Sequence, residues 1–154
     1  MSNTINWGKI QGLSYSPETN LTGTAAAPSF TNTKSIALDG VDDYVDCGNP
    51  TSLQITGELS ISAWVKTTNT STNGIVVGKD GVDPSATRSY QLQITSSGEA
   101  RLVAFKSGST LDLVTGTSTI NNGNWHHIMG VNDGTDLKIY VNGTLEATEV
   151  GGGG

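Results

Sequence analysis

The chain has 154 residues, the size of one domain, and carries fourteen acidic against eight basic side chains, for a net charge of −6. Only 14% of the residues are charged, and the basic ones are scattered, which excludes a nucleic-acid-binding surface built on clustered Lys and Arg. With 21 Thr, 16 Ser, 12 Asn and 20 Gly, the composition favours strands and tight turns and excludes a helical bundle.

The N-terminus has neither the basic region nor the apolar core of a signal peptide, and no apolar run could span a bilayer. We therefore expect no signal peptide and no membrane insertion. Residues 1–33 lack a regular hydrophobic period and contain two prolines, so we interpret them as an irregular N-terminal arm.

From residue 34 the pattern changes to short runs of alternating apolar and polar residues, separated by Gly, Asn and Asp. In residues 59–67, for example, the aliphatic side chains fall on one face and Trp64 lies among small polar groups on the other. Asn142-Gly143 is a typical two-residue hairpin turn, and Asp133-Gly134 is predicted to act similarly. The predicted strands are residues 35–38, 44–47, 59–67, 75–79, 90–95, 100–106, 111–115, 125–131, 137–141 and 145–149.

These runs predict an all-β domain over residues 34–150, built as an antiparallel β-sandwich. Four glycines follow as a tail, residues 151–154, which we expect to remain unpacked. The lone Cys47 lies in a predicted strand and is interpreted as a small buried thiol, since it has no partner for an internal disulfide.

Three segments carry a resemblance to a known family. They read IALDGVDDYV at residues 36–45, LSISAWVK at residues 59–66, and GNWHHI followed by DGTDLKIYVNG within residues 123–143. In this order they resemble laminin-G-like, concanavalin A-like jelly-roll domains. The resemblance implies two antiparallel sheets packed face to face and a mostly non-catalytic role in binding glycans or proteins, often with calcium.

The chain departs from that family by stopping near the hairpin at residues 142–143, where members usually continue into further strands. Either the sequence is part of a longer chain, or the missing strands leave open sheet edges, which invite pairing with the arm or a neighbouring chain. The arm and the module together are also similar to small phage-encoded proteins that decorate virions or form fibre tips. We therefore expect a homo-oligomer or lattice on a virion or another extracellular surface.

The densest cluster of oxygen ligands is formed by Asp39, Asp42 and Asp43, with Asp46 close in sequence. Calcium takes six to eight such oxygens, so the first three residues are candidate metal ligands. The alternative is structural, because aspartates in a bend commonly accept hydrogen bonds from nearby backbone N–H groups. No cofactor other than calcium is expected.

Sugar recognition places an aromatic ring against a pyranose face, and Trp64, Tyr90 and Tyr140 are the candidate ligand-binding residues. Their alternative role is a second small core covered by loops or by the arm. Trp125 alternates with other apolar residues of its run and is expected to pack inside.

The sequence allows two enzymatic interpretations. His126 and His127 are adjacent on a predicted strand and point to opposite faces, so a structural hydrogen-bonding histidine is preferred over a metal pair. Retaining glycosidases need two carboxylates about 5–5.5 Å apart, and the closest glutamates, Glu146 and Glu149, fall on opposite faces. No catalytic residue is predicted.

The sequence thus predicts a non-catalytic, surface-displayed module that binds a glycan or a protein neighbour, as a virion decoration or fibre component. A purely structural assembly protein strapped by its arm is the alternative, and a glycoside hydrolase is disfavoured.

Overall fold

The computed structural model describes residues 34–80, 88–105 and 111–153. The predicted arm, residues 1–33, lies outside the described residues. The chain divides into two compact units, Met1–Val45 and Asp46–Gly154, and the second unit contains every described strand.

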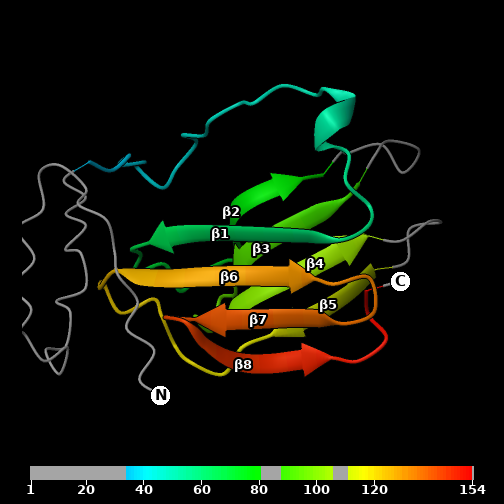
Figure 1. Cartoon of the computed structure of the whole chain (residues 1–154). Helices are drawn as coiled ribbons and strands as arrows, with labels where there is room; N and C mark the ends of the chain where they lie inside the picture. Colours follow the sequence, from blue (N-terminus) through cyan, green and yellow to red (C-terminus); the bar gives the residue numbers. More distant parts are fainter. Residues whose placement is uncertain (1–33, 81–87, 106–110, 154) are drawn as a thin grey trace, which may run out of the picture. The chain divides into compact units, whose positions relative to one another are not determined.

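The second unit is a sandwich of two four-stranded antiparallel sheets. The first sheet has the order β1-β6-β7-β8 and the second β2-β3-β4-β5; Figure 1 shows them as two layers, the first sheet in front. The elements are the 3-10 turn η1 (Thr51–Leu53), β1 (Leu59–Val65), β2 (Gly74–Lys79), β3 (Tyr90–Ile94), β4 (Ala100–Phe105), β5 (Leu111–Thr115), β6 (His126–Asn132), β7 (Leu137–Val141) and β8 (Thr144–Glu149). The prediction of an all-β sandwich is confirmed.

Two of the ten predicted strands are wrong. Residues 35–38 and 44–47 form no strand, and the exposed Cys47 is not a buried thiol. A short alternating run becomes a strand only where a ladder partner binds its backbone. In the bends beside these runs, the N–H groups of Asp39, Val41 and Gly48 donate to aspartate side chains.

The core lies between the sheets and is formed by side chains that alternate along each strand. Leu102 of β4 packs opposite Gly130 of β6, where an added Cβ would lie 2.8 Å from the leucine Cδ1. Ile61 and Val65 of β1 pack against the core from the first sheet, as their alternation predicts. The buried cluster comprises Leu92, Ile94, Ala100, Leu102, Ala104, Val114, Ile120, Ile128, Leu137, Ile139 and Val141.

Tight turns close the first sheet. Asn142 and Gly143 have φ values of 50° and 82°, which confirms the predicted hairpin turn between β7 and β8. The last glycines are packed, contrary to expectation: Gly152 and Gly153 are buried, and the Gly153 N–H donates to the carbonyl oxygen of Thr135 at 2.9 Å. Within the described residues, no helix is long and apolar enough to cross a membrane.

Candidate ligand-binding face

The outward face of the first sheet gathers aromatic side chains. Ile128, Gly130 and Asn132 of β6 point toward the second sheet, so the alternate residues of β6 point away from it. The ladder aligns Trp64 with His127, and aligns Ser62, Met129, Tyr140 and Leu145 in a second row across all four strands. We call this surface the aromatic face and define it by Trp64, Trp125, His127, Met129, Tyr140 and Leu145.

Both tryptophans of the aromatic face are open to solvent. Trp64 is 64% exposed and Trp125 is 51% exposed. The Trp64 and His127 rings lie 5.4 Å apart, centroid to centroid, with a tilt of 53°. The expectation that Trp125 packs inside is wrong. Trp125 lies two residues before His127 and therefore on the same, outward side of β6. The surface therefore offers indole rings without a covering layer of described residues.

The structure brings together two of the three predicted ligand-binding aromatics. Trp64 and Tyr140 share the aromatic face, on β1 and β7. Tyr90 lies in β3 of the second sheet and is only 8% exposed. It is on the same face of β3 as the core residues Leu92 and Ile94. Tyr90 is thus separate from the other two, and the roles of Trp64 and Tyr140 stay predictions.

His126 joins two loops at the end of the sandwich. Its ring nitrogens lie 3.1 Å from the Oδ1 of Asn122 and 3.1 Å from the Nδ2 of Asn142, while His127 faces Trp64 on the opposite side of β6. The two histidines therefore do not converge on one ion. His126 has the structural, hydrogen-bonding role that the sequence predicts.

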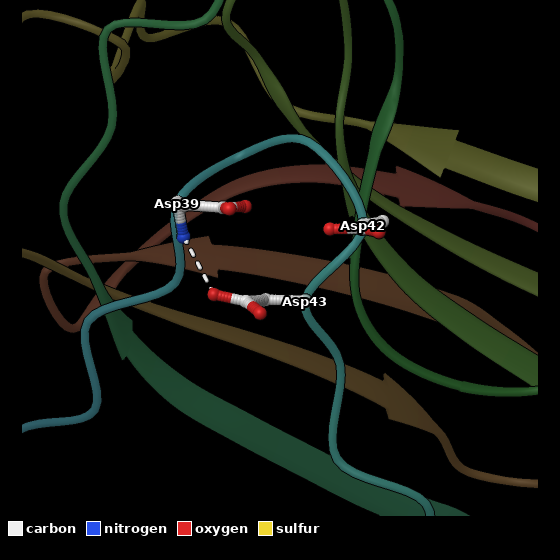
Figure 2. A group of neighbouring side chains, drawn as sticks. All are labelled: Asp39, Asp42 and Asp43. Carbon is white, nitrogen blue, oxygen red and sulfur yellow. Dashed lines mark hydrogen bonds between the residues drawn. The ribbon is translucent and has the colours of Figure 1, made fainter.

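The predicted calcium ligands lie in the first unit. One carboxylate oxygen from each of Asp39, Asp42 and Asp43 can be chosen so that all three lie within 4.8 Å of one another (Figure 2). The Asp39 N–H donates to the Asp43 carboxylate at 3.0 Å, and the Val41 N–H donates to the Asp39 carboxylate at 2.8 Å. The cluster is compact enough for one calcium ion but supplies three of its six to eight ligands, and two carboxylates already hold the turn. Calcium binding stays a prediction.

The outward face of the second sheet carries a polar row that sequence reasoning missed. Along β3 and its flanks, Ser89, Gln91, Gln93 and Thr95 point away from the core, and all four are buried. The Gln93 amide donates to Gln91, and the Gln91 amide donates to Asp80. The signal was the alternation of glutamine with apolar residues in β3, which predicts an outward polar row but not its burial.

An arginine completes this row. The Arg88 guanidinium donates two hydrogen bonds to the Asp80 carboxylate, at 2.5 and 3.1 Å, and lies 4.1 Å from the centre of the Phe105 ring. The ion pair with Asp80 raises the pKa of Arg88. Polar groups on this face are thus paired mainly with each other, unlike those of the aromatic face.

The sequence profile of the concanavalin A-like lectin/glucanases superfamily matches residues 39–154. The chain belongs to this superfamily. A search of curated protein sequences finds no relative of the chain.

Solved structures share the fold of this concanavalin A-like domain at low sequence identity. The CBM40 of the Ruminococcus gnavus IT-sialidase, bound to α2,3 sialyllactose, is 17% identical with a TM-score of 0.53, covering 65% of this chain and 56% of its own. The binding domain of Paraclostridial Mosquitocidal Protein 1 is 12% identical with a TM-score of 0.50, covering 62% and 25%. Domains LG4-5 of the mouse laminin α1 chain are 14% identical with a TM-score of 0.48, covering 62% and 24%. The matched region spans 56% of the CBM40 chain and about a quarter of each of the other two chains.

The superfamily name covers both lectins and glucanases, so the question for the carboxylates in this concanavalin A-like domain is whether one could act as a glycosidase acid. Glu146 of β8 accepts hydrogen bonds from the N–H groups of Thr117 and Ser118, at 2.7 and 3.0 Å. Burial acts to raise its pKa, but hydrogen bonds from Ser118 and Thr117 outweigh burial and lower it. A glycosidase acid needs a raised pKa, so Glu146 has the properties of a structural group.

Proposed function

We propose that this chain is a non-catalytic binding module that recognises glycans through the aromatic face. The observation that carries the proposal is the exposure of Trp64 and Trp125, 64% and 51%, on one side of one sheet. Exposed tryptophans are costly to leave in water, and an indole ring matches the apolar face of a pyranose. Ser60 and Ser62 precede Trp64 on the same exposed side of β1, where their hydroxyls are available to hydrogen-bond sugar hydroxyls.

Support also comes from the fold. The CBM40 neighbour has the same fold and is bound to sialyllactose, and the lowered pKa of Glu146 disfavours this one carboxylate as a hydrolytic acid. A face with few polar groups binds a single sugar weakly. Display of many copies, on a virion or another extracellular surface, would raise the overall avidity by about 10²–10⁴.

A glycan array tests the proposal. The protein is applied to an array of diverse oligosaccharides, once in the presence of calcium and once in the presence of a chelator. We expect binding to at least one glycan class, reduced about tenfold by Trp64→Ala because truncating a central tryptophan typically costs more than 1 kcal/mol. Leu111→Ala is the matched control, since it removes an exposed apolar side chain from β5 of the other sheet. Loss of binding only in chelator would show that binding depends on calcium, and equal losses in the two variants would contradict the proposal.

A second candidate function is a structural assembly protein, and it has its own observation. Large apolar side chains in residues 34–45 are exposed, among them Ile36, Val41 and Tyr44, as expected of a segment that docks on a neighbouring chain. Replacing Ile36, Val41 and Tyr44 together by serine discriminates the two functions, because it removes these exposed apolar side chains. A structural protein would lose its oligomeric state in analytical ultracentrifugation, whereas a glycan-binding module would keep its affinity per site.

A further inference from the structure

One end of the aromatic face carries a positive charge. Lys66 follows Trp64 by two residues, and the Gly123 N–H donates to the carbonyl oxygen of Thr67 at 3.0 Å. This hydrogen bond keeps the chain beyond β1 alongside the segment that leads into β6. Continuing the register from the pair Val65 and His126 places Lys66 opposite Trp125.

The charge of Lys66 is not neutralised by a described carboxylate. Lys66 is exposed, and among the described residues no carboxylate forms an ion pair with it, in contrast to Arg88 with Asp80 and Lys138 with Asp133. The second lysine on this side of the sheet, Lys138 of β7, is paired in this way. The end of the face where both indole rings are therefore carries an ammonium group that pairs with no carboxylate of the described residues.

Charge is also distributed unevenly along β1. Glu58 precedes the strand and lies against Gly134, where its Oε1 is 3.1 Å from the position of an added Cβ. Lys66 follows the opposite end of the strand, beside the tryptophans. Although the chain has a net charge of −6, the indole end of the aromatic face lacks an acidic neighbour within β1 and β6.

We propose that the ligand of the aromatic face is an acidic saccharide, whose pyranose ring stacks on Trp64 or Trp125 while its carboxylate pairs with the ammonium group of Lys66. This inference rests on the proposed function and narrows its ligand class. Lysine presents a compact charge on a flexible stem, which suits a single carboxylate whose position varies with the sugar. A neutral sugar would leave this charge unused.

Paired probes test the charge of the ligand alone. Oligosaccharides of galacturonate, glucuronate and mannuronate units are printed beside their methyl esters, which keep the sugar and remove the charge. For at least one pair we expect the full chain to bind the acid about two- to fivefold more tightly than its ester, the range of an exposed ion pair. Raising the ionic strength should reduce this preference, because salt screens exposed charges.

Lys66→Gln should abolish the preference for the acid over its ester. Lys138→Gln is the matched control, because it changes the net charge equally and should keep the preference. Equal binding of acid and ester in every pair would overturn the inference, as would equal effects of the two lysine variants. If esters bind and Trp64→Ala weakens them, the proposed function stands without the acidic ligand; if no saccharide binds, both fail.

Discussion

The two sheets of the sandwich present opposite kinds of outward face. On the second sheet, Gln91 and Phe105 point away from the core and yet are only 6% and 4% exposed. On the first sheet, Trp64 and Trp125 point away from the core and are largely open to solvent. Alternation along a strand therefore assigns a side chain to a face, but not whether a ligand can reach it.

The difference follows from how each face uses its polar groups. Asp80 accepts hydrogen bonds from Arg88 and Gln91, and Gln91 accepts one from Gln93, so the second sheet's polar groups are largely paired internally. Such a network stabilises the fold and leaves little for a ligand. The aromatic face has ring surface and hydroxyl groups with no comparable network, so its contacts are available to a partner.

The largest expected effect comes from truncating one aromatic ring on each face. Phe105→Ala should lower the free energy of unfolding by about 3–5 kcal/mol, because the ring is buried under the Arg88 guanidinium. Trp64→Ala should change it by less than about 0.5 kcal/mol, as for other exposed positions. Urea denaturation of both variants measures the contrast. Similar losses in the two variants would show that the faces do not differ in this way.

A smaller effect is expected from the polar row. Gln91→Ala removes the donor to Asp80 and the acceptor for Gln93, and should cost about 1–3 kcal/mol because buried polar groups lose their partners. Ser62→Ala, on the exposed face of β1, should be neutral within about 0.5 kcal/mol. Urea denaturation with both variants again gives the comparison, and a neutral Gln91→Ala would mean that water replaces the lost partners.

Much of the sandwich could be predicted from the sequence, because eight of the ten alternating runs are strands. Alternation over five to seven residues, as in β1 and β6, fixes which side chains enter the core. The turn at Asn142-Gly143 was equally predictable, since both positions adopt positive φ. Residues 35–38 failed because a four-residue run carries too little information without its ladder partner.

The candidate site was only partly predictable for a related reason. Trp64 and Tyr140 share a face because their strands have known alternation, but Tyr90 shares neither their sheet nor their exposure. Which strands become neighbours is set by tertiary pairing, and no local pattern encodes it. Trp125 was misassigned because both faces of β6 carry apolar residues, so alternation alone did not show that the face of Ile128 and Gly130, and not that of Trp125, is the buried one.

The smallest expected effect on the free energy of unfolding comes from a contact between the two sheets, made by Glu146. Glu146 of β8 binds the loop that follows β5 through the N–H groups of Thr117 and Ser118. Because folding lowers the pKa of Glu146 from 4.5, the carboxylate stabilises the fold at pH values above its unfolded pKa. That contribution is lost as the pH falls through 4.5 and then through the lower folded pKa, where the group is protonated in both states.

Glu146→Gln should therefore cost about 1 kcal/mol at neutral pH and progressively less as the pH falls below 4. Urea denaturation of wild type and variant across this range measures the change, and Glu149→Gln on the same strand controls for loss of net charge. A cost that is the same at neutral and acid pH would indicate that the variant disturbs packing between β8 and the loop. A cost that decreases in acid would show that the hydrogen-bonded carboxylate itself stabilises the connection between β8 of the first sheet and the loop after β5 of the second sheet.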